Sequence, residues 1–282
     1  MEKQEVSFQV LESVSFRSEQ IHFIVFVSVI LFVLLLEACF AAKKINKKIQ
    51  SDRWFFNVVL FFIGSLCVQL ILPVTAFSAS LWSQDTRWGL FNVVSTSIFS
   101  STLIFLIAAD LVLYLMHRLY HSHPWLWKIH AVHHSDQYFN VSTSLRFHPL
   151  EFIITSCLLC ATIVFLAVPP AAVLVYFVIQ AVSSAFTHGN FYLPDVIAKK
   201  LAWLIVTPNL HSVHHSVHRH QSNKNFGIVL TFWDRVFNTL SVVSLKTLRG
   251  ITHGVSEHMH IIPTNFSSVL FFPLRKKPRN KA

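Results

Sequence analysis

Long apolar runs constrain this sequence most, because a helix needs about 20 mainly apolar residues to cross the hydrocarbon core of a bilayer. Hydrophobic residues make up 53% of the chain and charged residues only 13%, which is not typical of a soluble domain. The last two runs are short and are separated by Pro169 and Pro170, so they form either two spans or a tight hairpin that does not fully cross. The sequence predicts an all-α integral membrane protein with about four to five membrane helices, from the apolar runs at residues 21–41, 54–72, 89–116, 152–168 and 171–187.

The basic residues indicate a membrane surface rather than nucleic acid as their partner. The formal net charge is +10, but the Lys and Arg residues concentrate in segments 43–53 and 275–281, next to apolar runs. Such clusters mark the cytoplasmic side of a membrane protein and attract anionic lipid headgroups. We therefore expect residues 117–151 and 188–282 to share the cytoplasmic face, and we expect no nucleic-acid partner.

Histidines are concentrated between positions 117 and 260, in motifs with helical spacing. One HxxxH motif is followed by two HxxHH motifs, and a single histidine comes directly after the last apolar run. Residues three and four positions apart share a face of a helix, so each motif can aim its imidazoles at one place. Either HxxHH motif alone could be a solvated helix face, but their combination on one membrane face indicates a metal centre. The candidate ligands are His117, His121, His130, His133, His134, His188, His211, His214 and His215.

Nine imidazoles are more than one structural zinc ion takes. A closed zinc site has four ligands, whereas nine suit two metal ions of higher coordination number, and iron is among the metals that imidazole binds. Asp110 and Tyr114 precede the HxxxH motif on the same helical stripe. A carboxylate inside an apolar span is a functional candidate. Asp110, together with Tyr114, either orients a ligand imidazole or only holds helices together.

In the order and spacing of these residues, the sequence resembles the fatty acid hydroxylase/sterol desaturase superfamily of membrane di-iron oxygenases. The likeness covers residues 105–240. It rests on Asp110…Tyr114…His117-Arg118…His121, on the first HxxHH motif with Ser135, and on Arg146…His148-Pro149-Leu150-Glu151. It continues through His188-Gly189-Asn190, Pro208 with the second HxxHH motif, Asn225-Phe226-Gly227 and Trp233-Asp234-Arg235…Phe237.

The resemblance implies that the nine histidines named above bind the two metal ions. Two positions depart from the family's pattern. Some lipid hydroxylases of the family have another histidine where this chain has Ser184, which leaves the ligand count open by one, and His148 or His218 could compensate. Asn238 stands where a glycine is usual. Other histidines are expected at the surface or near lipid headgroups, namely His218, His220, His253, His258 and His260.

The resemblance also implies a reaction. We expect a non-haem di-iron oxygenase that uses O2 to hydroxylate, or else desaturate, a lipid such as a sterol or a fatty acyl chain. Zinc can replace iron in purified protein, because imidazole sites accept several metals. The sequence has no dinucleotide fingerprint and no cysteine set for an iron–sulfur cluster, so a cytochrome b5-like, ferredoxin or flavin reductase partner is expected to supply electrons. The alternatives are a histidine-rich membrane zinc hydrolase and a metal transporter.

The chain is expected to divide into four segments. These are an N-terminal tail (1–20), membrane helices and loops (21–100), a catalytic domain similar to the fatty acid hydroxylases (101–240) and a basic cytoplasmic tail (241–282). The membrane is either a bacterial inner membrane or the endoplasmic reticulum, with the histidines on the cytoplasmic side. The sequence leaves the oligomeric state open.

Overall fold

The computed structural model describes residues 2–72, 74–256 and 270–271, and this part of the chain contains helices and no named strand. The prediction of an all-α protein is confirmed. The five long helices are α1 (Glu2–Phe40), α2 (Lys47–Ile71), α5 (Ile98–Ser122), α7 (Pro149–Leu166) and α8 (Pro170–Thr187). The shorter elements are α3 (Ala76–Asp85), α4 (Leu90–Val93), α6 (Pro124–His134), the 3-10 helix η1 (Val141–Leu145), α9 (Asp195–Leu201), α10 (Pro208–His214), α11 (Arg219–Ser222), α12 (Phe232–Val236) and α13 (Leu245–Arg249).

The long helices make this chain a multi-pass membrane protein. Five stretches, one around each long helix, are long and apolar enough to cross a membrane. Even α7 and α8, with 18 residues each, extend about 27 Å at 1.5 Å per residue, close to the thickness of the hydrocarbon core. Large side chains of α1 face outward, where lipid can cover them, with Phe23, Ile24 and Phe32 exposed by 61%, 63% and 60%.

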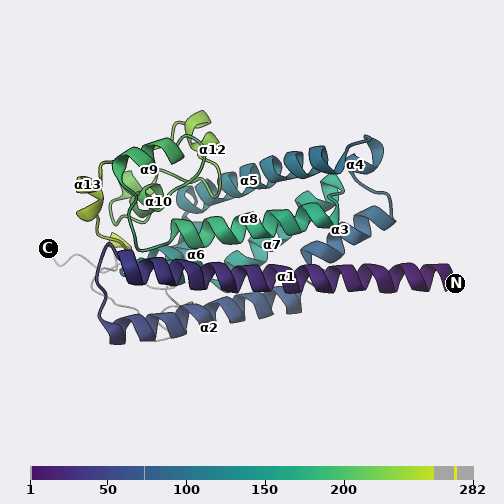
Figure 1. The fold of residues 1–282 in the computed structure, drawn as a ribbon, viewed down its shortest axis with the longest axis horizontal. Coiled ribbons are helices and arrows are strands. Elements are labelled where there is room, and N and C mark those ends of the chain that lie inside the picture. Colours follow the sequence, from purple (N-terminus) through teal and green to yellow (C-terminus); the bar gives the residue numbers. More distant parts are fainter. Residues whose placement is uncertain (1, 73, 257–269, 272–282) are drawn as a thin grey trace.

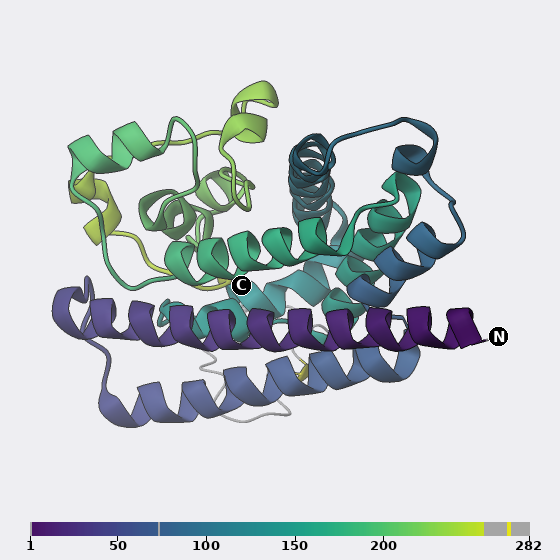
Figure 2. The same ribbon diagram turned by 45° about the vertical axis from the view of Figure 1, so that its right-hand side comes forward.

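The long helices form a bundle that is capped at one end by short helices. Figures 1 and 2 show α1 and α2 lying side by side along the longest axis of the molecule. α1 packs on α8, α2 packs on α7, and α5 contacts both α7 and α8. Phe105 of α5, Ile163 of α7 and Val173 of α8 are fully buried in the core between these helices. The helices α9, α10, α12 and α13 gather at the end of the bundle where α1 ends, opposite the N-terminus (Figure 1).

Two helix boundaries differ from the expected apolar runs. α1 begins at Glu2, so the segment expected to be an N-terminal tail is helical. The third run is divided into α4 and α5, because the Ser97 side chain accepts a hydrogen bond from the Ser100 amide at 3.1 Å and starts a new helix there. A serine at this position satisfies one of the free N–H groups of the first turn. Local capping therefore divides the run within its hydroxyl-rich part, residues 95–102.

Helix α3 lies in a stretch that apolar pattern alone does not identify as a helix. Thr75 and Ser78 form a capping box at its start, in which each side chain accepts from the backbone of the other. The Ser80 hydroxyl then donates to the Val168 carbonyl at 2.5 Å, which ties α3 to the turn between α7 and α8. Polar contacts thus fix the end of the bundle that lies far from the histidines.

Candidate metal centre

All nine candidate histidines lie at the capped end of the bundle and are buried, with at most 7% of each residue exposed. α6 and α10 begin with Pro124 and Pro208, where the missing N–H of proline costs no helical hydrogen bond. The four contributing elements are α5 with His117 and His121, α6 with His130, His133 and His134, the end of α8 with His188, and α10 with His211, His214 and the following His215.

The nine side chains form two groups. Within each group, one ring nitrogen from every histidine lies within 4.8 Å of the others. The five-histidine group contains His117, His121, His130, His134 and His214. The four-histidine group contains His133, His188, His211 and His215. The groups are neighbours, because the rings of His134 and His215 stack with centroids 4.4 Å apart.

In the five-histidine group, three rings are held by their Nδ1 atoms. Each of these nitrogens donates to an oxygen of the protein, which fixes the direction of the opposite nitrogen. The Nε2 atoms of the same three rings are buried and have no hydrogen-bond partner in the described part of the chain. The three bonds run from His117 to the Phe226 carbonyl (2.8 Å), from His130 to Glu151 Oε1 (2.7 Å) and from His214 to the Lys224 carbonyl (2.8 Å).

In the four-histidine group, the Nε2 atoms converge. His188 Nε2 lies 3.2 Å from His133 Nε2 and 3.0 Å from His211 Nε2, and His215 Nε2 lies 3.1 Å from His211 Nε2. Two imidazoles that bind one metal ion at about 2.1 Å and at a right angle have their nitrogens about 3.0 Å apart. The Nδ1 atom of His188 donates to the Ser184 carbonyl at 2.7 Å, so this ring is also oriented from behind. The spacing fits a set of ligands around one ion.

Burial favours the neutral form of the imidazoles of His133, His188, His211 and His214, and metal binding requires that form. Burial lowers the pKa of His188 to about 4 and that of His214 to about 3. Burial also lowers the pKa of His133 and His211 well below the usual range, and the neighbouring histidines add to this effect. At neutral pH the rings therefore offer lone pairs rather than repelling a cation.

Each HxxHH motif serves both groups, which differs from the expectation that a triplet aims at one place. His130 and His134 belong to the five-histidine group, whereas His133 belongs to the other. In α10 the outer residues of the motif belong to the four-histidine group and the middle residue, His214, belongs to the five-histidine group. At 100° per residue, positions i+3 and i+4 lie about 60° and 40° to opposite sides of position i. A helix that lies between the two groups can therefore direct its middle histidine into one group and its two outer histidines into the other.

Within the described residues, Asp110 and Tyr114 form their hydrogen bonds with groups other than imidazoles. The Asp110 carboxylate accepts from the amides of Val229 (3.0 Å) and Leu230 (3.3 Å) and from Trp233 Nε1 (3.0 Å). The Tyr114 hydroxyl bonds to the Thr239 hydroxyl at 2.7 Å. The expectation that Asp110 orients a ligand imidazole directly is not what the contacts show; it holds a loop instead.

This loop connects Asp110 and Tyr114 to the histidines indirectly. The carbonyl of Phe226 accepts from His117, and its amide donates to Asp234 Oδ1 at 2.8 Å. Thr239, the partner of Tyr114, donates to the same Asp234 oxygen at 2.7 Å. Asp110 and Tyr114 therefore help to hold the loop in place, and the Phe226 carbonyl of this loop orients His117.

Asp110→Asn is expected to destabilise the protein by about 1–3 kcal/mol, because one acceptor oxygen becomes a donor facing N–H groups. The midpoint of thermal unfolding in detergent measures this effect. Asp85→Asn is the matched control, since Asp85 is exposed. Equal midpoints for the two variants would contradict the assigned role of Asp110.

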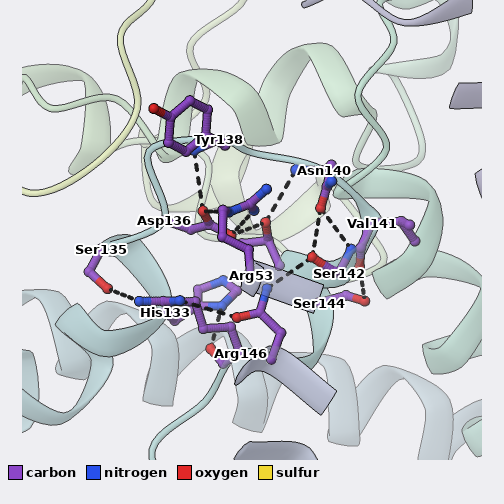
Figure 3. Close-up of polar contacts among 12 residues, drawn as sticks. Arg53, His133, Ser135, Asp136, Tyr138, Asn140, Val141, Ser142, Ser144 and Arg146 are labelled. Atoms are coloured by element: carbon purple, nitrogen blue, oxygen red, sulfur yellow. Dashed lines mark hydrogen bonds and ion pairs between the residues drawn. The ribbon is translucent and has the colours of Figure 1, made fainter. Parts of the chain in front are cut away.

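A buried ion pair behind the histidines was not expected from the sequence. Arg53 of α2 pairs with Asp136, the second residue after α6, with Arg53 Nε 2.7 Å from Asp136 Oδ1 (Figure 3). Burial alone would raise the pKa of Asp136, but the charges of Arg53 and Arg146 hold it well below its usual range. The only signal in the sequence was the position of Arg53 at the start of an apolar run.

Arg146 and Glu37 extend this buried network. The Arg146 guanidinium donates to the Val132 carbonyl at 2.9 Å and to the Ser135 hydroxyl at 2.8 Å, while its own carbonyl accepts from His133 Nδ1 at 3.1 Å. Figure 3 shows how Arg146 and Ser135 lie on one side of Asp136. Glu37 near the end of α1 accepts from the backbone amides of Val141 (2.7 Å) and Asn190 (2.8 Å). Membrane helices α1 and α2 are thereby tied to the segments that carry the histidines.

The remaining histidines do not all follow the expectation. His218 and His220 are exposed, as expected. His253 was expected at the surface but is 3% exposed, with its Nε2 2.9 Å from the Ser212 hydroxyl, and burial lowers its pKa to about 3. His148 accepts from the Leu150 amide and caps α7. Neither His148 nor His218 belongs to either group of potential ligands. His258 and His260 lie outside the described residues, as do the basic residues 275–281 of the tail.

The two departures from the family's pattern have local explanations. The Ser184 carbonyl accepts a hydrogen bond from His188 Nδ1. Because residue 184 is a serine, it adds no ring nitrogen to either group. Asn238 has a φ of 56°. This left-handed conformation favours glycine, and asparagine is among the few other residues that adopt it readily.

Comparisons with known proteins identify the part of the chain that carries the histidines. The family model described as Fatty acid hydroxylase matches residues 102–239. The chain is 30% identical to alkylglycerol monooxygenase of Homo sapiens over 152 residues, which are 53% of this chain and 33% of that protein. It is 33% identical to ornithine lipid hydroxylase OlsE of Rhizobium tropici over 168 residues, 59% of this chain and 46% of that protein.

A more distant relative is a very-long-chain aldehyde decarbonylase of Oryza sativa, with 26% identity over 217 residues, 73% of this chain and 32% of that protein. The chain therefore spans less than half the length of each of these relatives. No solved structure matches the chain.

Proposed function

Because residues 102–239 belong to the fatty acid hydroxylase/sterol desaturase superfamily, we propose that this chain is a membrane-bound oxygenase that uses O2 to hydroxylate a lipid. The observation that carries this proposal is the pair of buried histidine groups, in each of which one ring nitrogen from every histidine lies within 4.8 Å of the others. The names of two relatives specify a lipid or an alkylglycerol as the molecule acted on, which supports a lipid substrate here. We prefer hydroxylation to desaturation because these two relatives are named as a monooxygenase and a hydroxylase.

The residues fit two iron ions as the proposed cofactors. The five-histidine and four-histidine groups would each hold one ion through neutral imidazoles. When bound there, the two irons would supply the chemistry that activates O2 toward an unactivated C–H bond. The chain's part is to fix the nitrogens through Nδ1 bonds such as His130 to Glu151, to exclude water by burial, and to position the lipid carbon.

A cavity leads from the histidines toward the membrane helices. Its inner part, about 130 Å³, is lined by His117, His130, His133, His188 and His211. A larger chamber of about 520 Å³ continues between α1, α2, α7 and α8. This volume is within the usual range for ligand pockets, about 300–1,000 Å³. The path supports entry of the substrate from the bilayer.

The electron donor and the membrane are also parts of the proposal. We place the histidines on the cytoplasmic side of a bacterial inner membrane or the endoplasmic reticulum, because the Lys-rich 43–53 segment lies at the same end as the capping helices. A cytochrome b5-like, ferredoxin or flavin reductase protein would deliver electrons there. Exposed cations such as Arg219, whose guanidinium lies 4.9 Å from the Trp127 ring centroid near the histidines, would favour an acidic donor. The catalytic domain is proposed to span residues 101–240.

Metal analysis tests the proposal. The protein is produced in cells grown with iron-57 and is purified without added metal. It is expected to hold about two irons per chain, as in two-metal sites. Its Mössbauer spectrum after oxidation should show spin coupling between them. Turnover should require O2 and a reductant, which neither a zinc hydrolase nor a transporter needs. Zinc alone, with no iron bound even after anaerobic reconstitution with ferrous ions, would overturn the di-iron proposal.

A further inference from the structure

Three polar side chains line the cavity beside the histidines, and each has a polar atom without a hydrogen-bond partner in the described part of the chain. Glu151 and Tyr120 are only 6% and 3% exposed, yet Glu151 Oε2 and the Tyr120 hydroxyl make no hydrogen bond in the described part of the chain. The Tyr120 hydroxyl lies near Thr155 but not in hydrogen-bonding geometry. Gln180, in the apolar helix α8, lines the same cavity, and the described residues offer its amide no hydrogen bond.

These groups lie where the two parts of the cavity meet. Glu151 and Gln180 line both the inner part and the larger chamber, whereas Tyr120 lines only the inner part. The ring of Tyr120 stacks on that of His130 with centroids 5.2 Å apart, so its hydroxyl is held close to the five-histidine group. The larger chamber beyond this junction has Phe26, Phe61, Phe152, Leu159 and Phe177 in its walls, together with the polar residues Glu19, His22 and Gln69.

A buried carboxylate oxygen without a donor is costly, as is an unpaired hydroxyl or amide. The cost is removed when the ligand supplies the missing partner, and a ligand that lacks it is rejected. Glu151 Oε2 needs a donor, while the Gln180 amide and the Tyr120 hydroxyl can each donate and accept. A hydroxyl or a secondary amide offers both functions, but a methylene group offers neither.

We propose that Tyr120, Glu151 and Gln180 form a subsite for a hydroxyl or amide group of the lipid. This proposal rests on the proposed oxygenase function and adds to it the class of substrate and the way it is held. The polar group lies at the junction, the apolar chain extends into the larger chamber, and the inner part, a quarter of that volume, holds only a short portion of the lipid. The oxidised carbon is therefore within a few bonds of the polar group rather than at the far end of the chain.

Binding of two lipids of equal size tests the subsite. In 1-hexadecanol a hydroxyl occupies the place of a terminal methyl group of heptadecane. Both are used to displace tritiated 1-hexadecanol from anaerobic, iron-loaded protein in detergent, so that no turnover occurs. In the wild type, 1-hexadecanol is expected to displace the probe at about tenfold lower concentration than heptadecane, since one or two hydrogen bonds of about 1 kcal/mol each distinguish them.

Two variants remove the subsite without touching the imidazoles. In Gln180→Leu and Tyr120→Phe the preference for the alcohol is expected to fall to about threefold or less, for the loss of one hydrogen bond. Tyr120→Phe deletes an oxygen that makes no hydrogen bond within the described residues, so it should not impair folding. Gln69→Leu is the control, because Gln69 is exposed at the outer end of the larger chamber, and it should keep the full preference.

Partitioning of each lipid into detergent does not depend on the variant, so the change in the displacement ratio between variants is the deciding quantity. An identical ratio in the wild type, Gln180→Leu and Tyr120→Phe would overturn the subsite, and so would failure of 1-hexadecanol to bind the wild type. Iron content is measured on the same samples and should be unchanged. A preparation that holds no iron would contradict the oxygenase proposal instead, and the binding ratio can still be read with zinc-loaded protein.

Discussion

Replacing His134 with alanine is expected to lower the iron content from about two ions per chain to about one, because the five-histidine group loses a ligand while the other group stays complete. His211→Ala should remove the other ion by the same reasoning. Even changes to residues that only support metal ligands cost about 10–100-fold in affinity or activity. Lipid hydroxylation should therefore fall by at least about 100-fold in both variants.

Mössbauer spectra distinguish the two variants from general unfolding. Each should retain one uncoupled iron, and the two residual signals should differ because the remaining ligand sets differ. His220→Ala is the matched control, since His220 is exposed and belongs to neither group. It should keep both irons and full activity. Unchanged iron content in His134→Ala and His211→Ala would exclude these groups as the metal sites.

Asp136→Asn should have the largest effect on stability. The substitution leaves the Arg53 guanidinium buried at 4% exposure without its counter-charge, and Arg146 nearby is only 1% exposed. Breaking a buried ion pair by removing one partner costs about 3–5 kcal/mol. We expect a marked fall in the midpoint of thermal unfolding in detergent. Iron retention should also be weaker, because Asp136 lies only two residues after His134 of α6.

A double substitution tests whether the unpaired charge is the cause. Arg53→Met combined with Asp136→Leu removes both charges and should be less destabilising than Asp136→Asn alone. Asp52→Asn, a change of the exposed acidic neighbour, should leave the midpoint unaffected. If the double variant were at least as unstable as Asp136→Asn, packing rather than charge would explain the loss.

Some features of the fold follow directly from local patterns. The apolar runs predicted about four to five membrane helices, and the described residues contain five that are long and apolar enough to cross a membrane, because an apolar helix of about 20 residues has little alternative to lipid. Boundaries were less predictable. Capping by Ser97 divides the run at residues 89–116, and α3 forms in a stretch that apolar pattern did not identify. Such ends depend on individual hydrogen bonds that hydropathy does not record.

The histidine motifs predicted which side chains come together but not how they are shared. Spacing of three and four identified eight of them, the position directly after the last apolar run identified His188, and the structure brings the same nine into two groups. The motif alone did not show that His133 and His214 turn away from their own triplets. That division depends on where α6 and α10 lie relative to α5 and His188, which only the packed helices decide.

The sequence by itself determined the membrane helices and the set of nine candidate histidines, because continuous apolar runs, helical spacing and the place of His188 directly after the last run are all local patterns. The tertiary structure decided what the buried polar groups do. Asp110 accepts hydrogen bonds from a distant loop rather than from an imidazole, and Arg53 pairs with Asp136, which lies 83 positions later in the chain. Residues that far apart are brought together by packing, and a buried charge takes whichever partner the packed helices place within reach. Sequence alone shows that such a charge needs a partner, and the fold shows which one it has.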